Sequence, residues 1–244
     1  MRQQLGLDLV IANCENAAGG AGITPSIADD LFRCGVDVLT SGNHVWRKKE
    51  VFEMLKLDHR IVRPANYPEG VPGSGSTVIE SSSGVKVGIL NLMGRVFMEP
   101  LDCPFRTAEK EIARLRLITP VIIIDMHAEA TSEKIALGWF LDGKVSCVFG
   151  THTHIQTADE RILPKGTAFI TDLGMTGPYD SVIGRRIEQI LERFLTSLPH
   201  KSDVAEGNVQ MRGILLEVNP ATGKAVSVER IARTMDGVVA NTGD

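Results

Sequence analysis

Short apolar runs recur along this chain, and each is followed by a polar or glycine-rich loop and then by a helical pattern. The run "LDLVIANC" at 7–14 leads through "ENAAGGAGITP" to a helix that we expect to begin near Ser26. The run at 36–40 leads through "SGNHVW" to another helical pattern, and similar units begin at 120–126 and 144–149. Parallel strands joined by helical crossovers have this order, so the repeat predicts a layered α/β fold.

Antiparallel additions make the predicted sheets mixed. The stretch "STVIESSSGVKVGILNL" is typical of a hairpin that turns at 82–84, and "MRGILLEVNPATGKAVSVERI" predicts a second hairpin near the C-terminus. The proline-rich stretch 63–75 is expected to be a loop, and "RIEQILERFLTSL" a helix. With 244 residues, 43% of them hydrophobic, and no internal repeat, the chain predicts one domain over 1–244.

Charge and cysteine content narrow the class of protein. The formal net charge is −4, which gives no electrostatic basis for binding duplex nucleic acid or an anionic membrane. The four cysteines are widely spaced with no CxxC, so we expect reduced thiols rather than disulfides or a zinc knuckle. No apolar stretch reaches the roughly 18 residues of a membrane span. We therefore expect a cytoplasmic protein, with its oligomeric state open and a homo-oligomer among the options.

Polar side chains follow four of the predicted strands. Ligands of open α/β sheets bind beyond the carboxyl ends of the strands, so these side chains predict one shared site. They are Glu15 and Asn16, Asn43 and His44, His127 and Glu129, and His152 and His154.

The two histidines of "GTHTHIQT" are the sharpest feature of this set. His152 and His154 are two residues apart, and in extended backbone such a pair points to one face, where a metal ion would serve both. Single members have simpler explanations. His127 alone is more often an ordinary loop histidine, and Glu15 alone could cap a turn. It is their joint placement that favours a metal site.

The donor types indicate a hydrolytic metal centre. Carboxylate and amide oxygens mixed with imidazoles, without thiolate, suit Mn²⁺, Fe or Zn²⁺. The set exceeds what one tetrahedral ion needs, so we expect two ions about 3.5–4 Å apart, with Glu15 as the best candidate for a bridging ligand. Two such ions favour in-line displacement at phosphorus by a metal-bound hydroxide.

The motifs also resemble a known family. "GNH" at 42–44 with "GTHTH" at 150–154 resembles the calcineurin-like metallophosphoesterase superfamily. Longer strings such as "ANCENAAGG", "HAEATSEKIALGW" and "GMTGPYDSVIG" are similar to the YmdB-like bacterial phosphodiesterases, over 8 to about 231. The resemblance implies a four-layer α/β/β/α sandwich and a cytosolic phosphodiesterase with two metal ions, Fe or Mn before Zn. The implied substrates are small phosphodiesters, with 2′,3′-cyclic nucleotides as the suggested class.

Residue roles carry over by position. The resemblance implies that Glu15 bridges two ions and that His44 is the catalytic histidine, which contacts the phosphate or protonates the leaving oxygen. A simpler alternative for His44 is a hydrogen bond to a metal ligand. The remaining implied ligands are Asn16, Asn43, His127, His152 and His154.

The sequence departs from the family at its start. Members begin with one more strand, whose aspartate is a metal ligand, whereas "MRQQLG" reads as the last turn of the helix that follows such a strand. Asp8 is not the counterpart of that aspartate. We expect an in-frame stretch upstream of Met1 to encode the strand. Without it, stability and metal occupancy would suffer.

Two rival functions follow from these points. One is a metal-poor regulatory or binding module without catalysis, and the other is a metal-dependent ester or amide hydrolase that uses the same ligands. Metal analysis would separate the first from the phosphodiesterase, and assays with phosphodiester and ester substrates side by side would separate the second.

Four further expectations concern residues around the site. We expect Arg95 and Arg106 to lie in loops and anchor a cap-like insertion, and Trp46 and Trp139 to pack in the core. Asp125 or Glu129 is expected to orient the imidazole of His127.

Overall fold

A six-stranded mixed sheet lies at the centre of the computed structural model, which describes residues 2–234. Its inner strands are parallel and its two edge strands are antiparallel to them. Met93 therefore pairs with His127, and His127 with Thr151, so the carboxyl ends of neighbouring strands align at one edge. In spatial order the strands are β3 (Ser76–Glu80), β4 (Lys86–Met93), β5 (Ile122–His127), β6 (Cys147–Thr151), β8 (Ala168–Ile170) and β7 (Arg161–Ile162).

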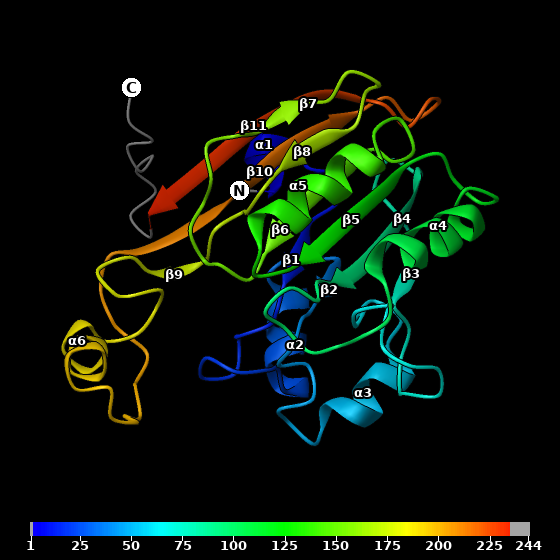
Figure 1. Ribbon diagram of the computed structural model, residues 1–244. Helices are drawn as coiled ribbons and strands as arrows, with labels where there is room; N and C mark the ends of the chain where they lie inside the picture. The colour runs from blue at the N-terminus through cyan, green and yellow to red at the C-terminus, as the bar shows by residue number, and fades with distance from the viewer. Residues whose placement is uncertain (1, 235–244) are drawn as a thin grey trace.

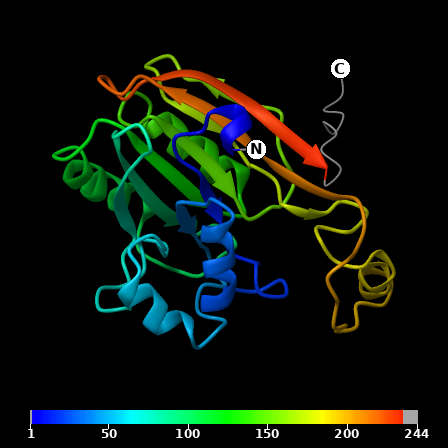
Figure 2. The same cartoon turned by 180° about the vertical axis from the view of Figure 1, so that it is seen from behind.

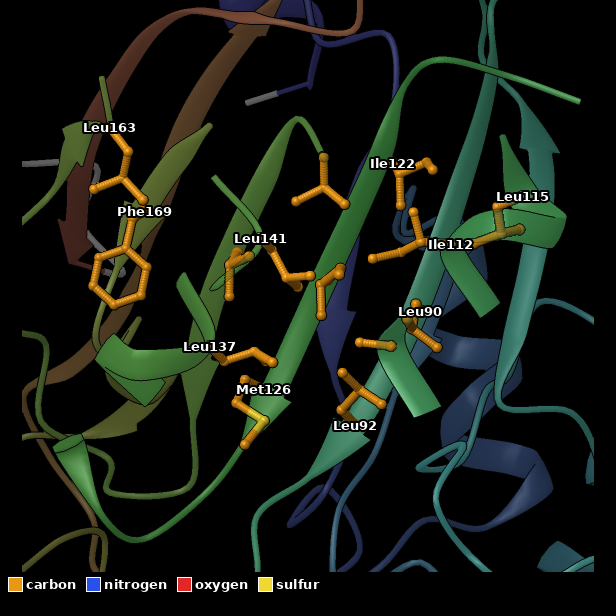
Figure 3. Close-up of a cluster of buried hydrophobic side chains, with 14 of the residues drawn as sticks. Leu90, Leu92, Ile112, Leu115, Ile122, Met126, Leu137, Leu141, Leu163 and Phe169 are labelled. Carbon is orange, nitrogen blue, oxygen red and sulfur yellow. The ribbon is translucent and has the colours of Figure 1, made fainter. Parts of the chain in front are cut away.

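Helices α4 (Pro104–Leu115) and α5 (Thr131–Phe140) cover one face of this sheet (Figure 1). Alternate strand residues face them, because side chains on a strand point to opposite sides in turn. Figure 3 shows Leu90, Leu92 and Met126 of the sheet in the same buried cluster as Ile112 of α4 and Leu137 of α5. Burial of each such side chain contributes about 1.5–3 kcal/mol to folding.

Two smaller sheets pack against the opposite face. Strands β1 (Ile11–Asn13) and β2 (Val38–Thr40) form a parallel pair. Val38 lies in one cluster with Ile89 of the central sheet. The third sheet consists of β9 (Gly177–Pro178), β10 (Val209–Val218) and β11 (Ala225–Thr234), and Leu216 and Val228 of its long hairpin pack against Phe149.

Helices α2 (Pro25–Arg33) and α3 (Val51–Leu57) form the outermost layer (Figures 1 and 2). Ala28 and Leu55 of these helices share a buried cluster with Leu39 of β2. The order of layers is thus helices, sheet, smaller sheets, helices, which confirms the predicted mixed α/β/β/α arrangement. Two helices lie outside these layers, α1 (Arg2–Leu5) and α6 (Ile187–Thr196), and α6 stands apart from the sheets in both views.

Several boundaries differ from the sequence-based expectation. The first predicted strand, 7–14, is regular only over Ile11–Asn13, because the Val10 amide donates to the Asp37 carboxylate instead of a ladder partner. The strand predicted at 120–126 is Ile122–His127, so His127 lies in the strand itself. The hairpin with its turn at 82–84 is confirmed by the pairing of β3 with β4.

Helix α4 was not predicted, and Arg106 lies within it rather than in a loop. Pro104 follows the extended residue Cys103 and begins the helix, where its missing N–H is harmless. Ala108, Ile112 and Leu115 then recur at helical spacing and are buried.

The two tryptophans differ in their surroundings. Trp46 packs on Phe52 and Tyr67 at ring-centroid distances of 5.3 and 5.5 Å, in agreement with its predicted packing role. Trp139 is 50% exposed, so its predicted place in the core is wrong, and the Arg161 guanidinium lies 5.6 Å from its ring centroid.

All four cysteines are free thiols, and burial raises the pKa of Cys147 to about 12. Within residues 2–234, no helix has the length and apolar character that crossing a bilayer requires.

Candidate active site

The polar residues predicted at the strand ends meet at the carboxyl edge of β1, β2, β5 and β6. His127 is at the centre of the group and is fully buried. Its ring nitrogens contact residues from two other strand ends, Asn43 after β2 and Thr151 at the end of β6. The sheet register thus brings together side chains that are more than 80 residues apart in sequence.

A chain of hydrogen bonds fixes the tautomer of His127. The Thr151 hydroxyl donates to Asp125 Oδ1 at 2.7 Å, so its oxygen accepts from His127 Nδ1 at 3.0 Å. Nδ1 therefore carries the proton and Nε2 holds a lone pair. Asp125 is fully buried, accepts also from Asn13 and Thr40, and its pKa is raised to about 6 by burial. Asp125 thus orients His127 indirectly, because the Thr151 hydroxyl bonds to both side chains.

Three acceptor atoms surround His127 Nε2. Asn43 Oδ1 lies 3.0 Å away, His152 Nδ1 3.1 Å and Glu15 Oε1 3.6 Å. His152 Nε2 is 3.0 Å from the Glu129 carboxylate, so Nε2 carries the proton and Nδ1 turns a lone pair towards His127. Glu129 thus orients His152 and not His127. Acceptor atoms that face one another without a proton between them can serve together as ligands of a cation.

Glu15 lies between His44 and His127. Its Oε1 accepts from the His44 amide at 2.6 Å and lies 3.2 Å from His44 Nδ1. Its Oε2 is buried and has no hydrogen-bond partner among the described residues. Burial raises the pKa of Glu15 to about 8, and the His44 amide opposes this rise. A buried carboxylate with an unpaired oxygen is stabilised most directly by a nearby cation.

Asn16 and His154 form a second pair of facing acceptors. His154 Nδ1 donates to the Ile183 carbonyl at 2.9 Å, which leaves a lone pair on Nε2. When the Asn16 amide nitrogen donates to the Gly20 carbonyl at 3.0 Å and to His44 Nδ1 at 2.9 Å, its oxygen lies 3.0 Å from His154 Nε2. This orientation avoids placing the amide oxygen against the Gly20 carbonyl. It also repeats the arrangement around His127.

His44 is the most accessible imidazole near Glu15. Its side chain is 28% exposed, and in this orientation of Asn16 its Nδ1 accepts from the Asn16 amide nitrogen at 2.9 Å, so Nε2 carries the proton. Among the described residues no hydrogen bond engages its Nε2. Burial lowers the pKa of His44, and the positive charge of Arg47 lowers it further. The ring is thus fixed at Nδ1, while its Nε2 remains available to a ligand.

The backbone of the histidine pair is not extended, contrary to the sequence-based expectation. His152 and His154 have φ values of 98° and 67°, in the left-handed region that residues other than glycine rarely adopt. The cause is Thr153, whose amide and hydroxyl both donate to Asp172 Oδ2, at 3.1 and 2.6 Å. Both imidazoles still reach the site, one at His127 and the other at Asn16.

A buried ion pair supports this loop. Lys134 of α5 donates to Asp172 Oδ2 at 2.7 Å, and the two side chains are 0% and 1% exposed. Asp172 Oδ1 also accepts from the Gly174 amide at 2.8 Å. Asp172 therefore accepts hydrogen bonds from the histidine loop (residues 152–154), from its own loop and from α5.

Gly42 makes room for His127. A Cβ at this position would lie 2.2 Å from His127 Nε2. We expect Gly42→Ala to displace the imidazole, to reduce stability by about 1–3 kcal/mol and to weaken metal binding. Urea unfolding and metal titration measure the two effects. Gly177→Ala is the matched control, because a Cβ there meets no atom within 4 Å and should leave both unchanged. Normal metal binding by Gly42→Ala would contradict the assigned contact.

The structure thus brings all seven predicted site residues together in two linked groups. Within residues 2–234, no group of three or more His, Cys, Asp and Glu side chains is arranged to hold a metal ion. Sequence reasoning missed Thr151, Lys134, Asp172 and Gly42. The only sequence signal that could have identified Lys134 and Asp172 was that each is a charged residue within or beside a predicted buried segment.

Comparisons with known proteins agree with this geometry. A profile of the family described as YmdB-like protein matches residues 1–231. The 2′,3′-cyclic-nucleotide 2′-phosphodiesterase of Bacillus subtilis (strain 168) is 52% identical over 221 residues, which is 91% of this chain and 83% of that protein. A putative phosphatase/phosphodiesterase of Mycoplasma pneumoniae is 38% identical, over 92% of this chain and 81% of that protein.

Solved structures share the fold. The crystal structure of a hypothetical protein from Thermus thermophilus has a TM-score of 0.89 and 42% sequence identity to this chain. The match covers 95% of this chain and 89% of that protein. A novel phosphatase from Mycoplasma pneumoniae has a TM-score of 0.88 and 36% identity, with coverage of 96% and 84%. The match of the family profile over nearly the whole chain, with relatives of this similarity, shows that the chain belongs to the YmdB-like protein family.

Proposed function

We propose that this chain is a metal-dependent phosphodiesterase that hydrolyses 2′,3′-cyclic nucleotides at the bond to the 2′ oxygen. The observation that carries the proposal is the two sets of facing acceptor atoms, one around His127 with Glu15 beside it and one at Asn16 and His154, in a chain 52% identical to a phosphodiesterase of that name. Phosphodiester hydrolysis is the chemistry that such a centre favours.

The residues present fit two cations. Facing acceptors lie 3.0–3.1 Å apart in both groups, and adjacent ligands of an octahedral ion with 2.1 Å bonds are about 3.0 Å apart. Asn43, His127 and His152 would hold one ion, and Asn16 and His154 the other. Glu15, whose Oε2 has no partner among the described residues, would serve both. Oxygen and imidazole donors without thiolate favour Fe or Mn, with Zn as the alternative.

The chain's own residues supply position and protons. Bound ions would contribute Lewis-acid stabilisation of the charge on the phosphate oxygens. In the reaction, water adds to phosphorus, the bond from phosphorus to O2′ breaks, and a proton must reach O2′. His44 is suited to this step because its Nδ1 accepts from the Asn16 amide nitrogen, which leaves the proton on Nε2, and Nε2 has no hydrogen-bond partner among the described residues. The product keeps the phosphate on O3′.

The location proposed for this reaction is the cytoplasm. Four free thiols in a chain without disulfides are typical of a reducing compartment.

The direct test is hydrolysis of 2′,3′-cyclic AMP in the presence of Mn²⁺, with the products separated by chromatography. We expect 3′-AMP and little 2′-AMP, and we expect bis-p-nitrophenyl phosphate to be hydrolysed as well. A carboxylic ester, p-nitrophenyl acetate, is the control substrate. Turnover of the ester without turnover of either phosphodiester would replace this proposal with a metal-dependent esterase.

A further inference from the structure

The segment between β9 and α6 contacts the site at His154 and at the Gly20 carbonyl. Its residue Ile183 accepts the hydrogen bond that orients His154. Two residues later, Arg185 is partly buried and extends towards the loop that carries Glu15 and Asn16. Arg185 therefore stands beside the candidate metal ligands, although it comes from a separate part of the fold.

The guanidinium of Arg185 shares a carbonyl with a candidate ligand. Its Nη2 donates to the Gly20 carbonyl at 3.1 Å, and the Asn16 amide nitrogen lies 3.0 Å from the same oxygen. A side chain on residue 20 would block this approach, because a Cβ there would lie 2.4 Å from Nη2. Gly20 also has φ of 89°, which favours glycine. The loop is thus shaped to receive an arginine next to Asn16.

Among the described residues, Arg185 forms no ion pair at contact distance, although its charge, after the Gln189 hydrogen bond, is among the influences that lower the pKa of Asp203. Its Nη1 donates to the Ser202 carbonyl at 3.1 Å, and within residues 2–234 it makes no ion pair with a carboxylate. Some partly buried arginines do make such pairs, as Arg230 does with Glu160 at 2.7 Å, whereas Arg212 bonds to the Gln210 amide oxygen. A guanidinium has five N–H donors, and the two bonds to carbonyls leave three of them for an anion. Arginine is well suited to binding phosphate through two parallel bonds.

We propose that Arg185 binds the phosphate group of the substrate, and that it does so for both the cyclic phosphodiester and the phosphomonoester product. This assignment rests on the proposed phosphodiesterase function and adds a substrate-binding residue that lies outside the metal ligands. The segment 182–185 would then have two roles: it orients His154 and it places a positive charge beside the anionic substrate.

A purely structural explanation makes different predictions. In that case Arg185 only ties its segment to the Gly20 loop, and substitutions should reduce stability without changing the affinity for phosphate. Arg185→Gln keeps a donor for the Gly20 carbonyl but removes the charge, whereas Arg185→Lys keeps the charge. Arg193→Gln, on the exposed side of α6, removes one positive charge elsewhere and is the control.

The experiment measures kcat and KM for 2′,3′-cyclic AMP and the inhibition constant of inorganic phosphate, at equal bound metal. For Arg185→Gln we expect kcat/KM to fall about 10- to 100-fold, and the inhibition constant for phosphate to rise by a similar factor. Arg185→Lys should recover part of both losses, and Arg193→Gln should behave as the wild type. An inhibition constant for Arg185→Gln within twofold of the wild-type value would overturn the assignment.

Failure of the proposed function gives a different result. If the wild-type protein hydrolyses no phosphodiester, the function is wrong. Calorimetric titration of the wild type and Arg185→Gln with inorganic phosphate then still decides whether Arg185 binds phosphate, since weaker binding by the variant supports it and equal binding refutes it. Melting temperatures of the variants show whether each one is folded.

Discussion

Replacement of His44 by alanine is expected to lower kcat for 2′,3′-cyclic AMP by about 10²- to 10⁴-fold, the usual contribution of a general acid or base. The Asn16 amide nitrogen donates to Nδ1, and the side chain is 28% exposed, so the protonated Nε2 can meet a substrate oxygen. His44 is not one of the facing acceptors assigned to the cations. The variant should therefore bind as much metal as the wild type and melt at a similar temperature.

The control for this experiment is His200→Ala. His200 is an exposed histidine that contacts Glu192, 3.1 Å away on α6, and its loss should leave kcat unchanged. If His44→Ala instead loses bound metal in proportion to activity, His44 stabilises the ligands and the proton transfer belongs to another group. Retention of more than a tenth of the wild-type kcat would also contradict the assigned role.

Replacement of Lys134 by methionine is expected to reduce the free energy of unfolding by about 3–5 kcal/mol, the usual effect of breaking a buried ion pair by removing one partner. Asp172 would be left as a buried charge without its cation, although Thr153 and Gly174 still donate to it. The Lys134 stem also lies against Gly150, where a Cβ would be 2.8 Å from its Cδ. The histidine loop begins at this point, so metal affinity should fall along with stability.

Urea unfolding of the metal-free protein measures the stability change, and a metal titration measures the affinity. Lys110→Met is the matched control, because Lys110 pairs with Glu69 only at 3.9 Å and on the surface. Its loss should change neither quantity appreciably. A Lys134→Met protein as stable as the wild type would show that the buried pair does not hold the loop.

The short apolar strands separated by helical patterns predicted a mixed α/β fold, whereas the four-layer order was implied by the family resemblance. The sequence also identified the site residues, because polar side chains that follow buried strands must meet at the carboxyl edge of a parallel sheet. His127 and His152 illustrate this, since their nitrogens are 3.1 Å apart although neither position is informative alone.

Other features depend on contacts that are distant in sequence and leave little local signal. The left-handed backbone of His152 and His154 is imposed by Asp172, about twenty residues later. The length of the first strand depends on Asp37, which captures the Val10 amide. Helix α4 was missed because its proline and charged residues resembled a loop, while its buried residues are only Pro104, Ala108, Ile112 and Leu115.

The most direct test of the central claim counts bound metal and activity on the same sample. The protein is stripped with a chelator, titrated with Mn²⁺, and assayed on 2′,3′-cyclic AMP at each step, with Glu15→Gln in parallel. We predict no turnover by the stripped protein, recovery of turnover as ions bind, and weaker binding by Glu15→Gln, whose side chain cannot supply a charged bridge. Full turnover by a protein that holds less than about one ion per ten chains would contradict the account.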